Sequence, residues 1–191
     1  MCPVISLPLT TPRLSIEMMR IQHAASLAEY RSDPDVARYQ DWDVPFSIEM
    51  AEGLVDGQSQ FDGPVSDDWV QLAVLREARS IGDVAVGIHD NGQQATIGYS
   101  ITPAEQGKGF ATEAVGAVIG ALFNEAHLHR VVAGIDPRNV ASRKVLDKLG
   151  FRYEGRSERS VLVRGDWVDD DRFALLASEY HRLTRRGADR R

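Results

Sequence analysis

Residues 96–111 read T-I-G-Y-S-I-T-P-A-E-Q-G-K-G-F-A, and this stretch decides the fold. Its first part, residues 96–101, has the β-branched and aromatic content of a strand, and the sequence from Gly109 onward is compatible with a long helix. The glycine-rich turn between them therefore lies at a helix N-terminus. Such a turn attracts an anion, because the glycines allow close approach and the first N–H groups of a helix lack internal partners. Lys108 adds a positive charge that suits a phosphate. A plain strand-to-helix connection with nothing bound is the alternative interpretation.

The composition narrows the class of protein. The chain has 191 residues, which favours one domain with a sizeable core. Lys and Arg total 22 against 28 for Asp and Glu, and this formal net charge of -6 argues against a nucleic-acid binder and is compatible with cationic partners. The single cysteine, Cys2, cannot form an internal disulfide, and no signal peptide or membrane-spanning apolar run is evident. These features predict a soluble, cytoplasmic protein.

The chain before the decisive stretch predicts a strand, three helical segments and a meander. Residues 13–20 alternate apolar and polar side chains, as a half-buried strand does. Helical spacing and capping residues predict the next three segments, which are residues 22–31, residues 35–39 with Asp35 as N-cap, and a helix capped by Ser47 that runs to about Gln60. Three strand signals follow at residues 69–75, 81–88 and 94–101. Short turns such as Asp90-Asn91-Gly92 make them an antiparallel meander.

The chain after the glycine turn changes the strand direction. Residues 130–135 read as a buried strand that a helical crossover places parallel to the previous one. A helix over residues 140–149 follows, with Asn139 in its cap and Gly150 in the C-terminal glycine position. Two further strands, 151–163 and 167–176, form a hairpin. The arginine-rich tail, residues 181–191, is predicted to be frayed and solvated. The sum is a mixed α+β fold in a single domain, residues 1–191.

Two further groups of residues can be explained either by a structural role or by a functional one. Trp42 lies between Asp41 and Asp43, where the indole plugs the core above two solvated acids or the acids form a lip for an amine. His127 and His129 stand at a helix end, where the helix dipole accounts for them, and their spacing does not indicate a metal site.

Four motifs in the same order carry a family resemblance. The segment Gln106-Gly107-Lys108-Gly109-Phe110-Ala111 resembles the Gln/Arg-x-x-Gly-x-Gly/Ala signature of GNAT superfamily N-acetyltransferases. The chain also resembles the branch of that family that acetylates ribosomal-protein N-termini. The three segments that carry this second likeness are Ile97-Gly98-Tyr99, Asn139-Val140-Ala141-Ser142 with the Lys144 to Phe151 segment, and Gly165-Asp166-Trp167-Val168-Asp169-Asp170.

The resemblance implies a fold and a co-substrate. It predicts a central sheet of about seven strands flanked by helices, in which the fourth and fifth strands, at Ile101 and Val132, splay apart to admit a thioester. Acetyl-CoA is the implied donor, no metal is implied, and a backbone N–H near Ile101 would polarise the thioester oxygen. The residues expected to hold the coenzyme are Ile101, Gln106, Gly107, Lys108, Gly109, Phe110, Ala111, Thr112, Asn139, Ser142 and Lys144.

The resemblance also assigns catalytic roles. Many superfamily members have a tyrosine general acid seven residues after the asparagine, where this chain has Leu146. The ribosomal branch uses the serine three residues after the asparagine, so Ser142 is expected to donate to the leaving sulfur and Asn139 to position the coenzyme or a water. A serine on the helix surface without chemistry is the alternative for Ser142.

The general base is missing from its usual places. Relatives often have a glutamate where this chain has Thr96 or Val161. A base must lie within hydrogen-bond reach of the amine, directly or through one water. Possible substitutes in the sequence are Asp43, Glu105 and Glu158, for which an ordinary solvated acid is the alternative interpretation. Water that relays the proton to solvent could also replace a base if the pKa of the acceptor amine is low.

The acceptor is expected to be a primary amine, either a small molecule such as a polyamine or aminoglycoside, or a protein N-terminus. Residues expected to contact it are Trp42, Asp43 and Tyr99. Transfer of another acyl group such as succinyl, or a non-catalytic CoA sensor, are the alternatives, and a dinucleotide-binding domain is disfavoured because Thr112 replaces its third glycine. No nucleic acid or membrane partner is expected, and the protein is predicted to be a monomer or homodimer.

Overall fold

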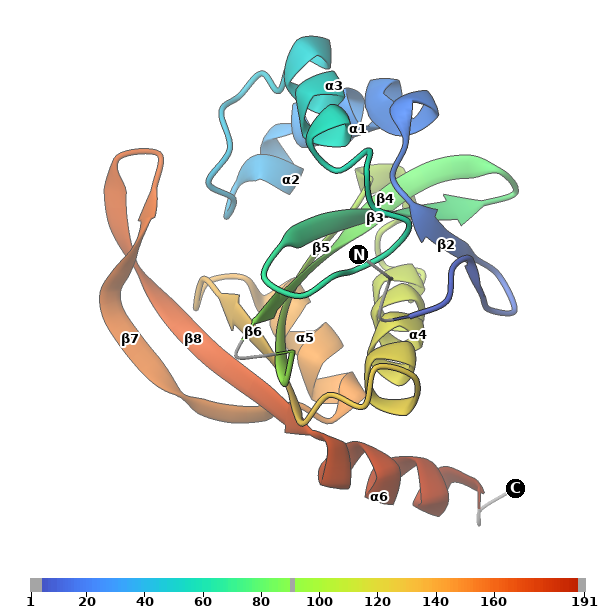
Figure 1. Cartoon of the computed structure of the whole chain (residues 1–191). Helices are drawn as coiled ribbons and strands as arrows, with labels where there is room; N and C mark the ends of the chain where they lie inside the picture. Colours follow the sequence, from blue (N-terminus) through green and yellow to red (C-terminus); the bar gives the residue numbers. More distant parts are fainter. Residues whose placement is uncertain (1–4, 90–91, 189–191) are drawn as a thin grey trace.

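The computed structural model describes residues 5–89 and 92–188, and they form one mixed sheet with helices on both faces (Figure 1). The strands are β1 (Leu9–Thr10), β2 (Ser15–Met18), β3 (Trp69–Arg76), β4 (Arg79–His89), β5 (Gln94–Ile101), β6 (Arg130–Ile135), β7 (Arg152–Val163) and β8 (Asp166–Leu176). The α-helices are α1 (Ala24–Arg31), α2 (Pro34–Ala37), α3 (Ile48–Gly57), α4 (Phe110–Asn124), α5 (Val140–Leu149) and α6 (Ala177–Ala188). Two short 3-10 helices are η1 (Ile21–His23) and η2 (Pro103–Glu105).

The sheet order is β1-β2-β3-β4-β5-β6-β8-β7. Neighbouring strands are antiparallel except β5 and β6, which are parallel because α4 carries the chain back across the sheet. This confirms the predicted mixed α+β fold with helices around a central sheet.

Alternate residues of β3 feed two separate cores, one on each face of the sheet. Leu72 and Val74 belong to the larger core, which includes the buried side of α4 and Leu146 of α5. Ala73 belongs to the second core, together with residues of α1 and α3 such as Leu27. Because successive side chains of a strand point to opposite faces, the two cores lie on opposite sides. The sheet is therefore covered by α4 and α5 on one face and by α1 and α3 on the other.

The predicted splay is present between β5 and β6. Their ladder pairs only residues 94–96 with residues 130–132, although β5 continues to Ile101 and β6 to Ile135. Beyond Thr96 and Val132 the two strands no longer pair, so one edge of each strand is left open at their C-terminal ends. The end of β5 leads directly into η2 and the glycine turn, so the opening lies beside the start of α4.

Several local predictions differ from the structure. The sheet has eight strands rather than about seven, because the two-residue strand β1 is too short to give a sequence pattern. The N-cap of α2 is Asp33 rather than Asp35, since the Asp33 carboxylate accepts from the N–H groups of Asp35 and Val36. Helix α3 ends at Gly57, before the predicted end near Gln60.

Three predictions concern segments at or near residues outside the described ranges. The tail predicted to be frayed forms α6 up to Ala188, whereas residues 189–191 lie outside the described residues. The predicted turn at Asp90-Asn91-Gly92 falls partly on residues 90 and 91, which also lie outside them, as does Cys2.

Candidate active site

The glycine turn before α4 has the backbone of an anion site. Gly107 and Gly109 have φ values of 74° and 85°. These values lie in the left-handed region, which residues other than glycine rarely adopt. The first helical hydrogen bond runs from the Glu113 N–H to the Gly109 oxygen, at 3.0 Å. The N–H groups that precede Glu113 therefore have no partner within the helix. A side chain on Gly107 would meet nothing within 4 Å, so the turn is open to a ligand.

Side chains fix this turn to the end of β5. The Gln106 side chain donates from Nε2 to the Ile101 oxygen at 2.9 Å. Glu105 accepts from Lys108 Nζ at 2.9 Å and from Arg76 Nη1 at 3.1 Å. The hydrogen bond from Lys108 is the main cause that lowers the pKa of Glu105. Glu105, one of the predicted substitute bases, is thus occupied in holding the turn and is a weakened proton acceptor.

Arg13 braces the turn from a distant part of the chain. Its Nη1 donates to the Lys108 oxygen at 3.1 Å, and its Nε donates to Glu113 at 2.6 Å. The guanidinium also lies 4.5 Å from the centre of the buried Phe110 ring, which Arg76 approaches at 5.3 Å. The sequence reasoning missed Arg13, because its contacts span about a hundred residues and no local pattern marks them.

Tyr99 and Ser142 meet beside the splay. Tyr99 lies on β5, and its hydroxyl is 2.7 Å from Ser142 Oγ and donates to the Ser142 carbonyl at 3.1 Å. Burial raises the pKa of Tyr99 to about 12, so the phenol keeps its proton at neutral pH and is a hydrogen-bond donor. Asn139 caps α5 by accepting the Ser142 N–H at 3.0 Å. Three of the predicted site residues are thereby brought together, and Tyr99, expected to contact the acceptor, is turned to Ser142.

Two other residues of α5 occupy contrasting positions. Leu146, at the place of the tyrosine acid in many superfamily members, is fully buried in the larger core. Lys144 is exposed near the start of the helix, where it is free to meet a phosphate.

Trp42 packs against the second core, on the face of the sheet covered by α1 and α3. The indole Nε1 donates to the Arg31 carbonyl at 3.0 Å, and the Arg31 guanidinium stacks 4.3 Å from the ring centre. Asp41 and Asp43 are exposed. This geometry agrees with the interpretation of Trp42 as a core plug flanked by solvated acids, and it leaves Asp43 at the surface.

Arg31 is the centre of a buried polar cluster under this indole. Its Nη2 lies 3.2 Å from Asp83 Oδ2 on β4, and the Tyr30 hydroxyl donates to Asp83 Oδ1 at 2.8 Å. All three side chains are buried, and desolvation raises the pKa of Tyr30 well above its ordinary range. The cluster ties α1 to the middle of the sheet.

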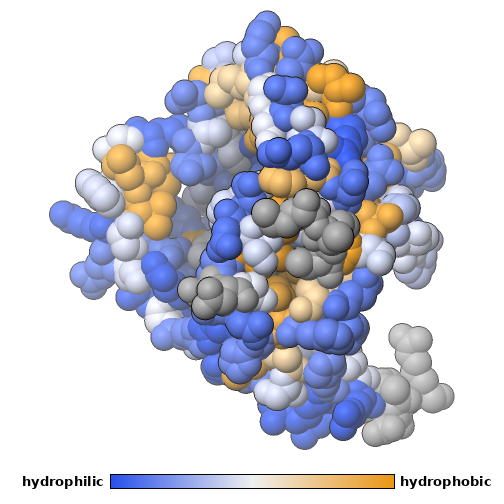
Figure 2. All heavy atoms as spheres, viewed as in Figure 1, coloured by the Kyte–Doolittle hydropathy of each residue, from blue (hydrophilic) through white to orange (hydrophobic). Residues whose placement is uncertain are grey.

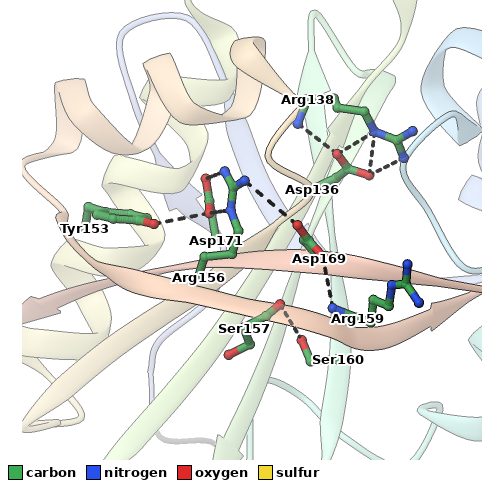
Figure 3. A network of polar contacts seen from close by, with 9 residues as sticks. All are labelled: Asp136, Arg138, Tyr153, Arg156, Ser157, Arg159, Ser160, Asp169 and Asp171. Carbon is green, nitrogen blue, oxygen red and sulfur yellow. Dashed lines mark hydrogen bonds and ion pairs between the residues drawn. The ribbon is translucent and has the colours of Figure 1, made fainter.

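Carboxylates and arginines gather where β6, β7 and β8 continue beyond the splay (Figure 3). Arg138 Nη2 donates to Asp136 Oδ2 at 2.6 Å, and Arg156 Nε donates to Asp171 Oδ1 at 2.8 Å. Hydrogen bonds from these arginines are the main cause that lowers the pKa of each carboxyl group. Glu158, another predicted substitute base, is exposed on β7.

The β7–β8 hairpin and the segment after α2 face each other across this region (Figure 1). Arg164, at the hairpin turn, donates to the Arg38 carbonyl at 3.3 Å, and the Tyr39 hydroxyl donates to the Arg138 carbonyl at 3.4 Å. The hairpin also carries an apolar surface patch, visible at the left of Figure 2, whose exposed members are Val161, Leu162 and Trp167.

The family model of the acetyltransferase (GNAT) domain matches residues 13–152 of this chain. The chain belongs to the GNAT acetyltransferase family. This GNAT enzyme is 31% identical to the uncharacterized N-acetyltransferase p20 of Bacillus licheniformis, over 90% of this chain and 97% of that protein. It is 26% identical to the [ribosomal protein uS5]-alanine N-acetyltransferase of Escherichia coli, over 90% of this chain and 92% of that protein.

The structural comparison agrees with the family assignment. The structure of Mycobacterium smegmatis RimJ in complex with CoA-disulfide superposes with a TM-score of 0.74 at 25% identity, covering 91% of this chain and 89% of that one. The GNAT enzyme is an acyl-CoA-dependent N-acyltransferase, as the sequence predicted.

Two further class predictions concern metals and membranes. Among residues 5–89 and 92–188, no group of three or more His, Cys, Asp or Glu side chains is arranged to hold a metal ion. Within the same residues, the GNAT enzyme has no helix long and apolar enough to span a bilayer.

Proposed function

We propose that this GNAT enzyme transfers the acetyl group of acetyl-CoA to the α-amino group of a protein N-terminus. The observation that carries the proposal is the pairing of an open, glycine-framed helix N-terminus with the Tyr99–Ser142 hydrogen bond beside the splay. One part suits a diphosphate and the other suits a leaving thiolate, and the splayed strands join the two.

The residues around the turn fit coenzyme A. The N–H groups from Gly107 to Thr112 would take the pyrophosphate, and Lys108 and the exposed Lys144 would add positive charge. Gln106 holds the Ile101 carbonyl, which keeps the end of β5 in place beside the pantetheine arm and leaves a nearby N–H for the thioester oxygen. Bound acetyl-CoA supplies an activated acyl carbon and a thiolate leaving group. The chain supplies the binding groups and the geometry.

Ser142 is the proposed proton donor to the departing sulfur. The protonated Tyr99 phenol carries one hydrogen, and when it donates this hydrogen to Ser142 Oγ rather than to the Ser142 carbonyl, the hydroxyl hydrogen of Ser142 is free to point toward the splay. Asn139 fixes the first turn of α5 through the Ser142 N–H and so holds the serine in place. A positioned proton donor of this kind contributes on the order of 10²- to 10⁴-fold to rate.

A protein acceptor is supported by two observations. The E. coli relative is named for alanine of ribosomal protein uS5. The apolar patch of the hairpin, Val161, Leu162 and Trp167, gives a second contact area beyond the reacting amine. A ribosomal-protein acceptor would place the enzyme in the cytoplasm, and we expect it to act as a monomer or homodimer.

The test is thiol release from acetyl-CoA with a panel of amines. We expect turnover with peptides that carry free ribosomal-protein N-termini and none with the same peptides blocked at the α-amine. Spermidine and an aminoglycoside test the small-molecule classes, and succinyl-CoA tests another donor. Faster turnover with either amine than with every free peptide would overturn the protein-acceptor assignment, and faster turnover with succinyl-CoA would overturn the donor.

A further inference from the structure

A buried carboxylate on β8 lies directly over the backbone of β6. Asp170 is only 9% exposed. A methyl group built on Gly134 of β6 would lie 2.5 Å from Asp170 Oδ1 and 3.0 Å from Oδ2. The carboxylate therefore occupies the space that any other residue at position 134 would fill. Gly134 is what allows an acid to lie against this strand.

Asp170 lies beside the end of β6 that no longer pairs with β5. The β5–β6 ladder stops at Thr96 and Val132, whereas Gly134 lies two residues further on and on the same face as Val132. At this level β6 still pairs with β8, through Gly134 and Arg172, but no longer with β5. Asp170 thus lies over the part of β6 whose edge toward β5 is open, beside the gap where a donor and an acceptor have to meet.

The charges around Asp170 leave it available as a proton acceptor. Arg172 Nε lies 3.2 Å from its Oδ2, but that arginine side chain is 62% exposed. Burial is the main cause that raises the pKa of Asp170, the neighbouring Asp171 adds to the rise, and Arg172 and the Ile135 backbone N–H oppose it. On β7, the residue paired with Asp170 is the uncharged Ser157.

Nearby carboxylates are arranged differently. Asp136 and Asp171 are each bound by an arginine that lowers the pKa, and Asp169 accepts the Arg159 N–H at 3.0 Å (Figure 3). A carboxylate with a lowered pKa holds a transferred proton poorly, so a raised pKa is the better match to an amine donor.

We propose that Asp170 is the general base of this enzyme, taking a proton from the acceptor ammonium group directly or through one water. The inference rests on the proposed function. It supplies, from β8, the base that is missing at Thr96 and Val161. Because Asp170 and Ser142 come from β8 and α5, proton removal and proton donation are assigned to separate elements.

The proton count closes. Asp170 takes one proton from R-NH₃⁺ and passes it to solvent, which leaves a neutral nitrogen with its lone pair. That nitrogen forms the new C–N bond, the C–S bond breaks with its electron pair on sulfur, and Ser142 gives the sulfur a proton. The nitrogen then loses its second proton, which restores Ser142 through solvent. The balance is one amide, one thiol and one proton released.

The decisive variant is Asp170→Asn, which keeps the shape of the side chain and removes the base. We expect kcat/KM to fall about 100-fold or more at neutral pH. The limb of the pH profile that reports the carboxylate should disappear, while CoA affinity by calorimetry is unchanged. Asp169→Asn is the matched control one residue away, and it should keep both the rate and the profile. An Asp170→Asn enzyme with wild-type rate and profile would overturn the assignment.

Two readouts do not depend on turnover. A ¹³C NMR titration of the free protein should place the Asp170 carboxyl pKa above that of an ordinary aspartate. Since the folded-state pKa is raised, the charged form is the destabilising one, and wild type loses stability as pH rises through this pKa. The Tm of Asp170→Asn minus that of wild type should therefore become more positive with rising pH. An ordinary or lowered pKa would contradict the proposal even if the acceptor were wrongly assigned.

A cycle with Gly134→Ala tests the contact itself. In wild type the added methyl group must displace the carboxylate, so kcat/KM should fall while CoA affinity stays. In an Asp170→Ala background the same methyl group has room and should change kcat/KM by less than twofold. Equal losses in both backgrounds would show that Gly134 acts independently of Asp170 and would overturn the proposed geometry. Wild-type inactivity with every amine would instead refute the proposed function.

Discussion

The two sides of the splay are built in different ways. On the coenzyme side, several hydrogen bonds join residues three to five apart, such as Lys108 to Glu105 and Gln106 to Ile101, and Arg13 adds a contact from a distant part of the chain. On the acceptor side, contacts join residues 99 and 126 apart, as in Tyr39 to Arg138 and Arg164 to Arg38. Local contacts leave a motif in the sequence, whereas distant ones do not. The difference explains why a sequence motif points to the proposed diphosphate site and none points to the proposed base.

The two sides also differ in charge. The coenzyme side presents free backbone N–H groups and Lys108 at a helix N-terminus, all of which favour an anion. The other side presents Asp136, directly after β6, and the β8 carboxylates Asp170 and Asp171, each paired with an arginine. We therefore expect a cationic amine and an anionic coenzyme to be drawn to opposite sides of one opening. Variants on either side can be matched with control variants elsewhere in the molecule.

The largest effect is expected from Gly109→Val. A β-branched residue at φ 85° costs about 1–3 kcal/mol of backbone strain, and relief of that strain moves the N–H groups away from the diphosphate. We expect CoA binding to be lost in calorimetry. Gly165→Val, at φ 93° in the hairpin turn, is the matched control and should lose similar stability but keep CoA binding. Tight CoA binding by Gly109→Val would contradict the assignment of the turn.

A smaller effect is expected from Ser142→Ala. The cap of α5 is kept, because Asn139 accepts from the backbone N–H of residue 142 and not from its hydroxyl. Turnover in steady-state assays should fall about 100-fold with CoA affinity within a few-fold of wild type. Ser160→Ala, an exposed serine of the hairpin, should have no effect. Unchanged turnover would remove Ser142 from the mechanism.

The smallest effect is expected from Trp167→Ala, which tests whether the β7–β8 hairpin contacts a protein acceptor. Trp167 is 61% exposed, so its loss should cost little stability. We expect KM for a full-length protein acceptor to rise several-fold and KM for a short peptide to stay the same. Trp69→Ala removes a comparably exposed tryptophan from β3 and should change neither KM. Equal effects of Trp167→Ala on both acceptors would argue against the hairpin as a protein contact.

The sequence predicted the main elements of the fold because they depend on neighbouring residues. The strands at residues 69–101, the parallel crossover to β6 and the Gly150 helix end all follow from periodicity and glycine chemistry. Strand β1 was not predicted, because a strand of two residues has no recognisable alternation of apolar and polar side chains. The cap of α2 was misplaced because Asp33 and Asp35 both flank Pro34 with the same type of side chain.

The same division applies to the site. The sequence by itself determined the glycine turn at the start of α4 and the placement of Asn139 and Ser142 at the start of α5, because helix ends are specified by the residues at those ends. Only the tertiary structure decided that Tyr99 faces Ser142, that Arg13 braces the turn and that Asp170 lies over Gly134. Those contacts depend on which strands lie side by side, and strand order is set by burial of the whole sheet and not by any single segment.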